Sequence, residues 1–343
     1  MGASRDVFGG SLFRNFLIAL GLGVVVYLAF SIFAGFDNLG GALREFDLRL
    51  LPLILGLVLL SYAGRFVRWI YYLEVLRVRV PLATNAAIFC AGLSMAISPG
   101  KLGEVLKSIF VRQVTGAPIA RTAPAVVAER ATDGTGMVLW GVIGALVFGG
   151  FGLGILVLFV LATVVVIVVL RSKRLSVLAE RVLLRLPLLN RLAPHLSDFQ
   201  ASSNTLLGPR ALAVGTAISF LSWGLECVAV YLCSVGLGVD RPFLMVVFIF
   251  AVSSLAGALF FTPGGIGVAE AGLAGGFLTL AGLARGPALA LTFVVRLVTL
   301  WFAAAIGVVG LVVVRYIIGS GENGGPSGRP EAEAERQLAG GGE

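Results

Sequence analysis

Charged residues, histidine and cysteine are scarce in this sequence. Only 13% of its 343 residues are charged, and it contains one histidine and three cysteines. A soluble domain carries about 25% charged residues, so the composition excludes an ordinary soluble enzyme. His195 stands alone, and Cys90, Cys227 and Cys233 fall in apolar segments without the paired spacing of zinc or haem sites. We therefore expect no metal, no cofactor and no catalytic residues.

The sequence also lacks the motifs of nucleotide and nucleic-acid sites. No GxxxxGK[ST] stretch is present, so the chain is not expected to drive ATP-dependent pumping by itself. The basic residues of segment 171–191 alternate with leucines and not with the aromatic side chains on which bases stack, so we expect no nucleic-acid partner. That segment fits an amphipathic helix on an anionic lipid surface, or equally a solvated loop that only sets orientation.

Apolar residues, by contrast, dominate the chain. It is 58% hydrophobic with 46 glycines, and its mean hydropathy is +1.00. Runs long enough to cross a hydrocarbon core of ~30 Å recur from end to end. They lie at residues 16–36, 50–64, 134–170, 211–225 and 297–314. The sequence therefore predicts an all-α fold, a polytopic membrane helix bundle.

The positions of Lys and Arg predict how this bundle is oriented. The first run is too long for a signal peptide and lacks a small-residue cleavage site, so we expect it to be a membrane helix. Basic residues near helix ends favour the cytoplasm, which places the segment 171–208 and both termini on that side of the cell membrane. We expect one membrane domain over residues 1–318 and a disordered cytoplasmic tail over residues 319–343.

Two polar stretches interrupt the apolar runs in the same way. SPGKLGE at residues 98–104 and TPGGIGVAE at residues 262–270 each contain a Pro-Gly turn, a further glycine and a glutamate. Proline and glycine end a helix and turn the chain. We therefore predict two Pro-Gly helical hairpins in addition to about six full-length helices, or about eight membrane segments by hydropathy.

The hairpins belong to a longer internal repeat. Glu104 and Arg130 are 26 positions apart, as are Glu270 and Arg296, and LLSYAGR at residues 59–65 echoes FLSWGLE at residues 220–226. The repeats span residues of about 50–148 and 211–316, and the charge count gives them opposite orientations. Inverted repeats with broken helices are a common basis of alternating access, with the binding site where the broken helices meet.

Charged residues also occur within or beside the apolar runs, where each costs about 2.5–3.5 kcal/mol on insertion scales. So many charges are expected to pair or to line a wet cavity, although each is also explained as a fastening between helices that binds no ligand. The charges expected to support a site are Arg65, Arg68, Lys107, Glu129, Asp133 and Glu226.

The Pro-Gly turns predict the site itself. A helix that begins at Pro99-Gly100 presents free N–H groups and a positive dipole end, and Lys101 adds a full charge, which suits phosphate. Glu270 pairs with Arg296, takes up a coupling proton or cation, or is an ordinary helix-start acid. The expected ligand-binding residues are Pro99, Gly100, Lys101, Gly103, Glu104, Arg130, Pro263, Gly264, Gly265, Gly267, Glu270 and Arg296.

The same stretches carry a family resemblance. SPGKLGE is followed by VVAERATD, and PGGIGVAE by FVVRLVTLW. In these signatures, and over residues of about 16–316, the sequence resembles the membrane region of lysylphosphatidylglycerol synthases and the stand-alone flippase-like proteins related to it. The resemblance implies a role in moving or presenting a polar-headed lipid. In two-domain relatives a soluble domain aminoacylates the lipid; this sequence ends in a short tail, so aminoacylation is not expected.

These inferences together predict a lipid translocator whose headgroup site lies between the two turns while the acyl tails stay in lipid. It would act as a scramblase or use an ion gradient, with a membrane phospholipid or lipid-linked substrate as its partner. Two alternatives stay open. One is a membrane enzyme that acts on a lipid-linked phosphate through Glu104, Glu129 and Asp133, and the other is a non-transporting scaffold for a partner lipid-modifying synthase.

Overall fold

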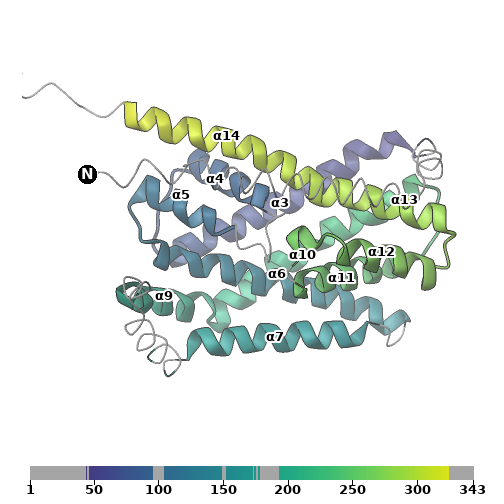
Figure 1. The fold of residues 1–343 in the computed structure, drawn as a ribbon, viewed down its shortest axis with the longest axis horizontal. Coiled ribbons are helices and arrows are strands. Elements are labelled where there is room, and N and C mark those ends of the chain that lie inside the picture. The colour runs from purple at the N-terminus through teal and green to yellow at the C-terminus, as the bar shows by residue number, and fades with distance from the viewer. Residues whose placement is uncertain are drawn as a thin grey trace, which may run out of the picture.

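The chain folds into a bundle of α-helices in a computed structural model (Figure 1). The structure describes residues 44, 46–95, 104–148, 152–172, 174, 177, 193–260 and 262–323. No strand occurs within these ranges, which confirms the predicted all-α class. The predictions for run 16–36, for the turn at residues 96–103, for most of segment 171–191 and for the tail beyond residue 323 fall outside the described residues.

Up to residue 171, the predicted run 50–64 lies almost wholly in one helix, whereas the predicted run 134–170 is divided between two helices, one ending at Phe148 and the next beginning at Leu153. A short 3-10 turn, Leu48–Leu50, leads into the first long helix. The elements that follow are α3 (Leu51–Val75), α4 (Leu82–Ser94), α5 (Leu106–Thr115), α6 (Ile119–Phe148) and α7 (Leu153–Arg171). Helices α4 and α5 are the two predicted arms of the first hairpin.

The second part of the chain repeats this order of helices. Helix α9 (Ala193–Leu206) connects to α10 (Pro209–Gly236), which α11 (Phe243–Leu259) and α12 (Val268–Thr279) follow as the arms of the second hairpin. The chain then forms α13 (Arg285–Arg296), a π-helical turn at Leu297–Trp301, and α14 (Phe302–Asn323). Helix α14 thus extends a few residues into the segment expected to be a tail.

Helices α3 and α10 end in the same backbone motif, 161 positions apart. Arg77 and Gly238 adopt left-handed backbone conformations, with φ of 57° and 67°. In both cases the two N–H groups after the last turn bond back across it in the pattern of a Schellman motif. The bonds run from Arg77 to Glu74, Val78 to Leu73, Gly238 to Val235 and Val239 to Ser234, each at 2.9 Å. A proline then starts each hairpin, Pro81 before α4 and Pro242 before α11.

Among the residues that the structure describes, four helical segments are long and apolar enough to cross a membrane. They are Leu48–Val75, Leu153–Arg171, Pro209–Gly236 and Arg285–Ile318. Helix α6 has 30 residues but carries Glu129, Arg130 and Asp133 near its middle. The hairpin arms α4, α11 and α12 are shorter apolar helices. The predicted total of about six crossings plus two hairpins stays a prediction.

The last helix of each repeat, α6 in residues 50–148 and α14 in residues 211–316, packs on the hairpin of the other repeat. Helix α14 lies along α4 (Figure 1), and α6 lies along α11. Glycines allow the first contact: a Cβ at Gly307 would fall 2.0 Å from the backbone nitrogen of Ser94, and one at Gly310 would fall 2.5 Å from that of Ala91. Helices α3 and α10 pack against each other between these two pairs.

Candidate functional site

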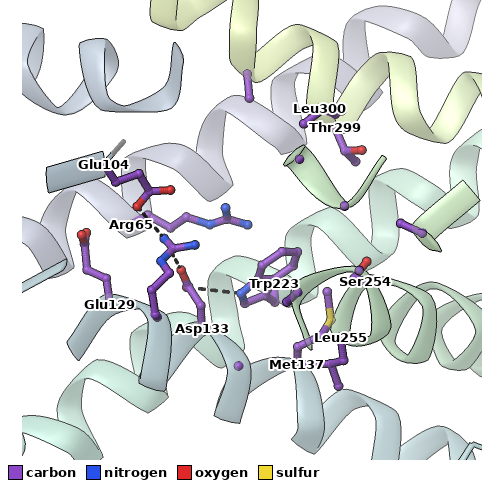
Figure 2. Close-up of a pocket in the computed structure, with 18 of the residues that line it drawn as sticks. Arg65, Glu104, Glu129, Asp133, Met137, Trp223, Ser254, Leu255, Thr299 and Leu300 are labelled. Carbon is purple, nitrogen blue, oxygen red and sulfur yellow. Dashed lines mark hydrogen bonds and ion pairs between the residues drawn. The ribbon is translucent and has the colours of Figure 1, made fainter. Parts of the chain in front are cut away.

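The predicted charged residues converge on one cavity of about 370 Å³. Its described lining comes from helices α3 to α7 and α10 to α14, from the second Pro-Gly turn and from the π-helical turn. Figure 2 shows Glu104, Arg65 and Glu129 on one side of the cavity and Met137 and Leu255 on the other. The cavity therefore has a charged end and an apolar end.

Arg130 is the centre of the charged end. Its guanidinium lies 3.0 Å from Glu104, at the start of the second arm of the first hairpin, and 3.0 Å from Asp133, one turn along α6. Its side chain is 32% exposed, whereas the carboxylate side chains of Glu104 and Asp133 are 9% and 6% exposed. Arg130 and Asp133 are at i,i+3 on α6, the spacing at which two side chains meet on one face of a helix. Arg130 is thus the paired charge that a ligand in the cavity reaches most readily.

A buried network of ion pairs and hydrogen bonds stabilises the charged end of the cavity. Arg68, which is 1% exposed, donates to Asp133 at 2.5 Å and also to Ser219 of α10. Lys107 of α5 pairs with Glu129 of α6. These bonds tie α3, α5, α6 and α10 together, and each carboxylate has two basic partners: Asp133 pairs with Arg68 and Arg130, and Glu129 with Lys107 and Arg68.

Arg65 and Glu226 join α3 to α10. The Arg65 guanidinium lies 2.5 Å from the Glu226 carboxylate, which also accepts a hydrogen bond from Ser61 at 3.2 Å. The Arg65 guanidinium carbon lies 4.2 Å above the ring of Trp223, within the range of a cation–π contact. Trp223 in turn donates to Asp133 at 3.3 Å (Figure 2). Arg65 and Glu226, the last residues of the two similar stretches, therefore contact each other.

The second Pro-Gly turn forms part of the cavity wall. Gly264 and Gly265 line the cavity with φ of 62° and 72°, values that favour glycine. Arg296 donates to the Gly264 carbonyl at 2.8 Å and to the Glu270 carboxylate at 2.7 Å. Glu270 also accepts the N–H of Gly267 at 2.7 Å, at the start of α12. Of the three alternatives for Glu270, the pairing with Arg296 and the place at a helix start are both present, and Arg296 joins the turn to α13.

A π-helical turn directly after Arg296 completes the site. Such turns are rare and occur frequently at functional sites. The Thr299 carbonyl accepts a hydrogen bond from the Tyr62 hydroxyl at 3.0 Å, which joins the turn to α3. Thr299 and Tyr62 both line the cavity. This element was not predicted from the sequence.

The structure places the predicted site residues as follows. Eleven of them line the cavity: Arg65, Arg68, Glu104, Lys107, Glu129, Arg130, Asp133, Glu226, Gly264, Gly265 and Arg296. Pro263 lies in the second turn, and Gly267 and Glu270 lie after it, at the start of α12. Pro99, Gly100, Lys101 and Gly103 lie outside the described residues. Sequence reasoning missed Tyr62 and Trp223, although each follows the aligned serine of the two echoed stretches and precedes the aligned charge by three positions.

Comparison with known proteins relates this site to a family. Residues 17–307 match the family described as the lysylphosphatidylglycerol synthase TM region. A UPF0104 membrane protein of Methanothermobacter thermautotrophicus is 33% identical over 122 residues, which cover 35% of this chain and only 36% of that relative.

Two longer matches extend the comparison over most of the chain. A UPF0104 membrane protein of Methanothermobacter thermautotrophicus is 26% identical over 305 residues, or 84% of this chain and 90% of the relative. Another, of Pyrococcus horikoshii, is 24% identical over 329 residues, or 88% and 97% of the two chains. The match of residues 17–307 includes all the predicted site residues. The chain is a multi-pass integral membrane protein and belongs to the lysylphosphatidylglycerol synthase TM region family.

Proposed function

We propose that this protein translocates a lipid with a phosphate-bearing or otherwise polar headgroup across the cell membrane, as a flippase-like or scramblase-like transporter and not as an enzyme. The observation that carries the proposal is the joint cavity. Charged residues of the first half, Arg65 and Arg130, and the Pro-Gly turn of the second half line the same space. A cavity lined by both halves is the arrangement that alternating access requires.

Arg130 is the proposed contact for the headgroup. Its planar guanidinium matches the geometry of phosphate or carboxylate oxygens, and it is the most exposed of the paired charges described in the cavity. Five basic and four acidic side chains are among the described lining residues: Arg65, Arg68, Lys107, Arg130, Arg296, Glu104, Glu129, Asp133 and Glu226. This excess of one positive charge favours an anionic or zwitterionic headgroup. Lys101, which lies outside the described residues, would add to it.

The proposal includes an inverted repeat. Three correspondences support it: the matching Schellman motifs after α3 and α10, the Glu104–Arg130 and Glu270–Arg296 pairs, and the exchange by which α14 packs on α4 while α6 packs on α11. Opposite insertion of the halves would present the cavity to either face of the membrane in turn. Both termini would then lie in the cytoplasm.

Reconstitution tests the proposal directly. The full-length protein is placed in vesicles with fluorescent phospholipids of anionic and zwitterionic classes, and the loss of inner-leaflet protection from a reducing agent is followed over time. We expect faster exchange of at least one anionic phospholipid than in protein-free vesicles. Equal rates for every lipid class would contradict the proposal.

A further inference from the structure

The middle of α7 forms part of the wall at the apolar end of the cavity, together with residues of α6 and α11. Helix α7 is the most apolar of the four candidate spans, with a mean hydropathy of 3.4, and only 6% of its most apolar 18-residue stretch is buried. Its two ends are anchored: Leu156 is 2% exposed and packs where Gly141 of α6 leaves room, and Arg171 donates to the Leu207 carbonyl at 3.1 Å. Phe159, Ala162, Thr163 and Val166 lie between these anchors and line the cavity.

This wall reaches the outer surface of the bundle. Val166 lines the cavity and yet is 44% exposed, and Ala258 of α11 is another lining residue that is exposed. The cavity is therefore open between the middle of α7 and the end of α11. In a membrane-spanning bundle, an opening flanked by apolar residues faces hydrocarbon.

Phe159 marks the boundary between the two ends of the cavity. Its ring lies against Gly134, where an added Cβ would fall 1.9 Å from a ring atom. Gly134 directly follows Asp133, which belongs to the charged end. Beyond the ring, the buried side chains of Met137 and Leu255 line the apolar end (Figure 2).

From this arrangement we infer, building on the proposed function, that the hydrocarbon chain of the translocated lipid occupies the apolar end and leaves the cavity between α7 and α11. An apolar recess of this kind offers nothing to a free phosphate or a sugar phosphate, but it buries methylene groups. The volume of about 370 Å³ suits a small ligand and not a whole phospholipid, so only the first part of the chain lies inside. The ligand class is thus a lipid with its headgroup at Arg130 and its tail past Phe159.

Photo-crosslinking in vesicles tests this path. The probe is a phosphatidylglycerol with a diazirine in one acyl chain, in bilayers of phosphatidylcholine and phosphatidylglycerol containing the full-length protein. Bulk lipid labels exposed positions such as Val165, but Met137 and Leu255 are each 2% exposed and are reached only through the cavity. We expect adducts on these two residues. Translocation without such adducts would overturn the inference and leave the proposed function intact, whereas adducts without translocation would support the site and contradict the function.

Three tryptophan variants of α7 test the opening between α7 and α11: two should block it and the third is their control. Ala162→Trp and Thr163→Trp each place a bulky ring at the cavity wall. The control is Val165→Trp, which places the same ring on the outer face of α7, where Val165 is 59% exposed. We expect either blocking variant to reduce adducts on Met137 at least about fivefold relative to Val165→Trp. Equal labelling in a folded blocking variant would overturn the inference, and the wild-type crosslinks decide it even if both blocking variants misfold.

Discussion

The guanidinium of Arg296 lies 2.7 Å from the carboxylate of Glu270, and the same side chain donates to the carbonyl of Gly264 at 2.8 Å. The corresponding pair in the first half, Arg130 and Glu104, is 3.0 Å apart, with Arg130 the more exposed arginine at 32% against 11%. The two pairs therefore have different roles. Arg296 fixes a turn, and Arg130 presents charge to the cavity.

Removal of the Glu270 carboxylate should destabilise the second hairpin. Glu270→Ala leaves Arg296 as an uncompensated buried charge and the Gly267 N–H without its acceptor, at a cost of about 3–5 kcal/mol in the free energy of unfolding. The measurement is unfolding in mixed detergent micelles.

Two further variants control this measurement. Glu74→Ala, which removes an exposed carboxylate at the end of α3, should change stability by less than about 0.5 kcal/mol. The double variant Glu270→Ala/Arg296→Met should be more stable than Glu270→Ala alone, because both charges are then gone. A double variant less stable than either single one would contradict the buried-pair account.

Close contact between α14 and α4 should make Gly307 intolerant of any side chain. In Gly307→Ala the new Cβ would meet the Ser94 backbone nitrogen at 2.0 Å, so the helices must separate, and we expect a loss of about 1–3 kcal/mol. Gly56→Ala is the control, because nothing lies within 4 Å of its Cβ position in α3. That change should leave stability unchanged or raise it by about 0.5–1 kcal/mol. Equal behaviour of the two variants would refute the close approach.

The contact of Arg65 with Glu226 should appear as a coupling energy. Arg65→Met and Glu226→Met are each expected to destabilise the protein, and the double variant should lose less than the sum by roughly 1–3 kcal/mol, because the 2.5 Å pair is removed as a unit. Thermal unfolding of the four proteins of the cycle measures this. Arg65→Met combined with Tyr316→Leu, on the exposed part of α14, is the control pair and should be additive. Additivity of Arg65→Met with Glu226→Met would show that the contact contributes nothing.

The helical hairpins could be predicted from the sequence because they depend on local features. Pro263 and the glycines after it had to break a helix, and α12 begins at Val268 as expected. The interval of 26 residues marked Glu104 and Arg130 as the counterparts of Glu270 and Arg296, but a contact was expected only for Glu270 with Arg296, as one of three alternatives. Both contacts are present.

Features that depend on how the helices face one another could not be predicted. Arg68 lies closest to Asp133, and Glu129 pairs with Lys107. Which acidic residue meets which basic residue is set by the rotation of the helices about their axes. Trp223 lies in an apolar run and therefore looked like an ordinary core residue. The π-helical turn contacts the distant Tyr62 through the Thr299 carbonyl, a contact that no feature of the local sequence marks.

Accessibility labelling tests the inversion of the repeat. Single cysteines at Leu82 and Asp240, both exposed and each near the start of a hairpin, are introduced after Cys90, Cys227 and Cys233 are replaced by alanine. We expect a membrane-impermeant thiol reagent to modify position 240 from outside intact cells and position 82 only after the cells are opened. Labelling of both positions from the same side would contradict opposite insertion.

The central claim, that a charged cavity accepts the headgroup of a translocated lipid, is tested most directly by the exchange rate of fluorescent phosphatidylglycerol in vesicles that contain Arg130→Gln. Arg112→Gln, on the exposed face of α5 and away from the cavity, is the matched control. We predict wild-type exchange with Arg112→Gln and a rate at least about tenfold lower with Arg130→Gln, the loss of one charge-assisted hydrogen bond. A folded Arg130→Gln protein that exchanges lipid as fast as Arg112→Gln would contradict the account.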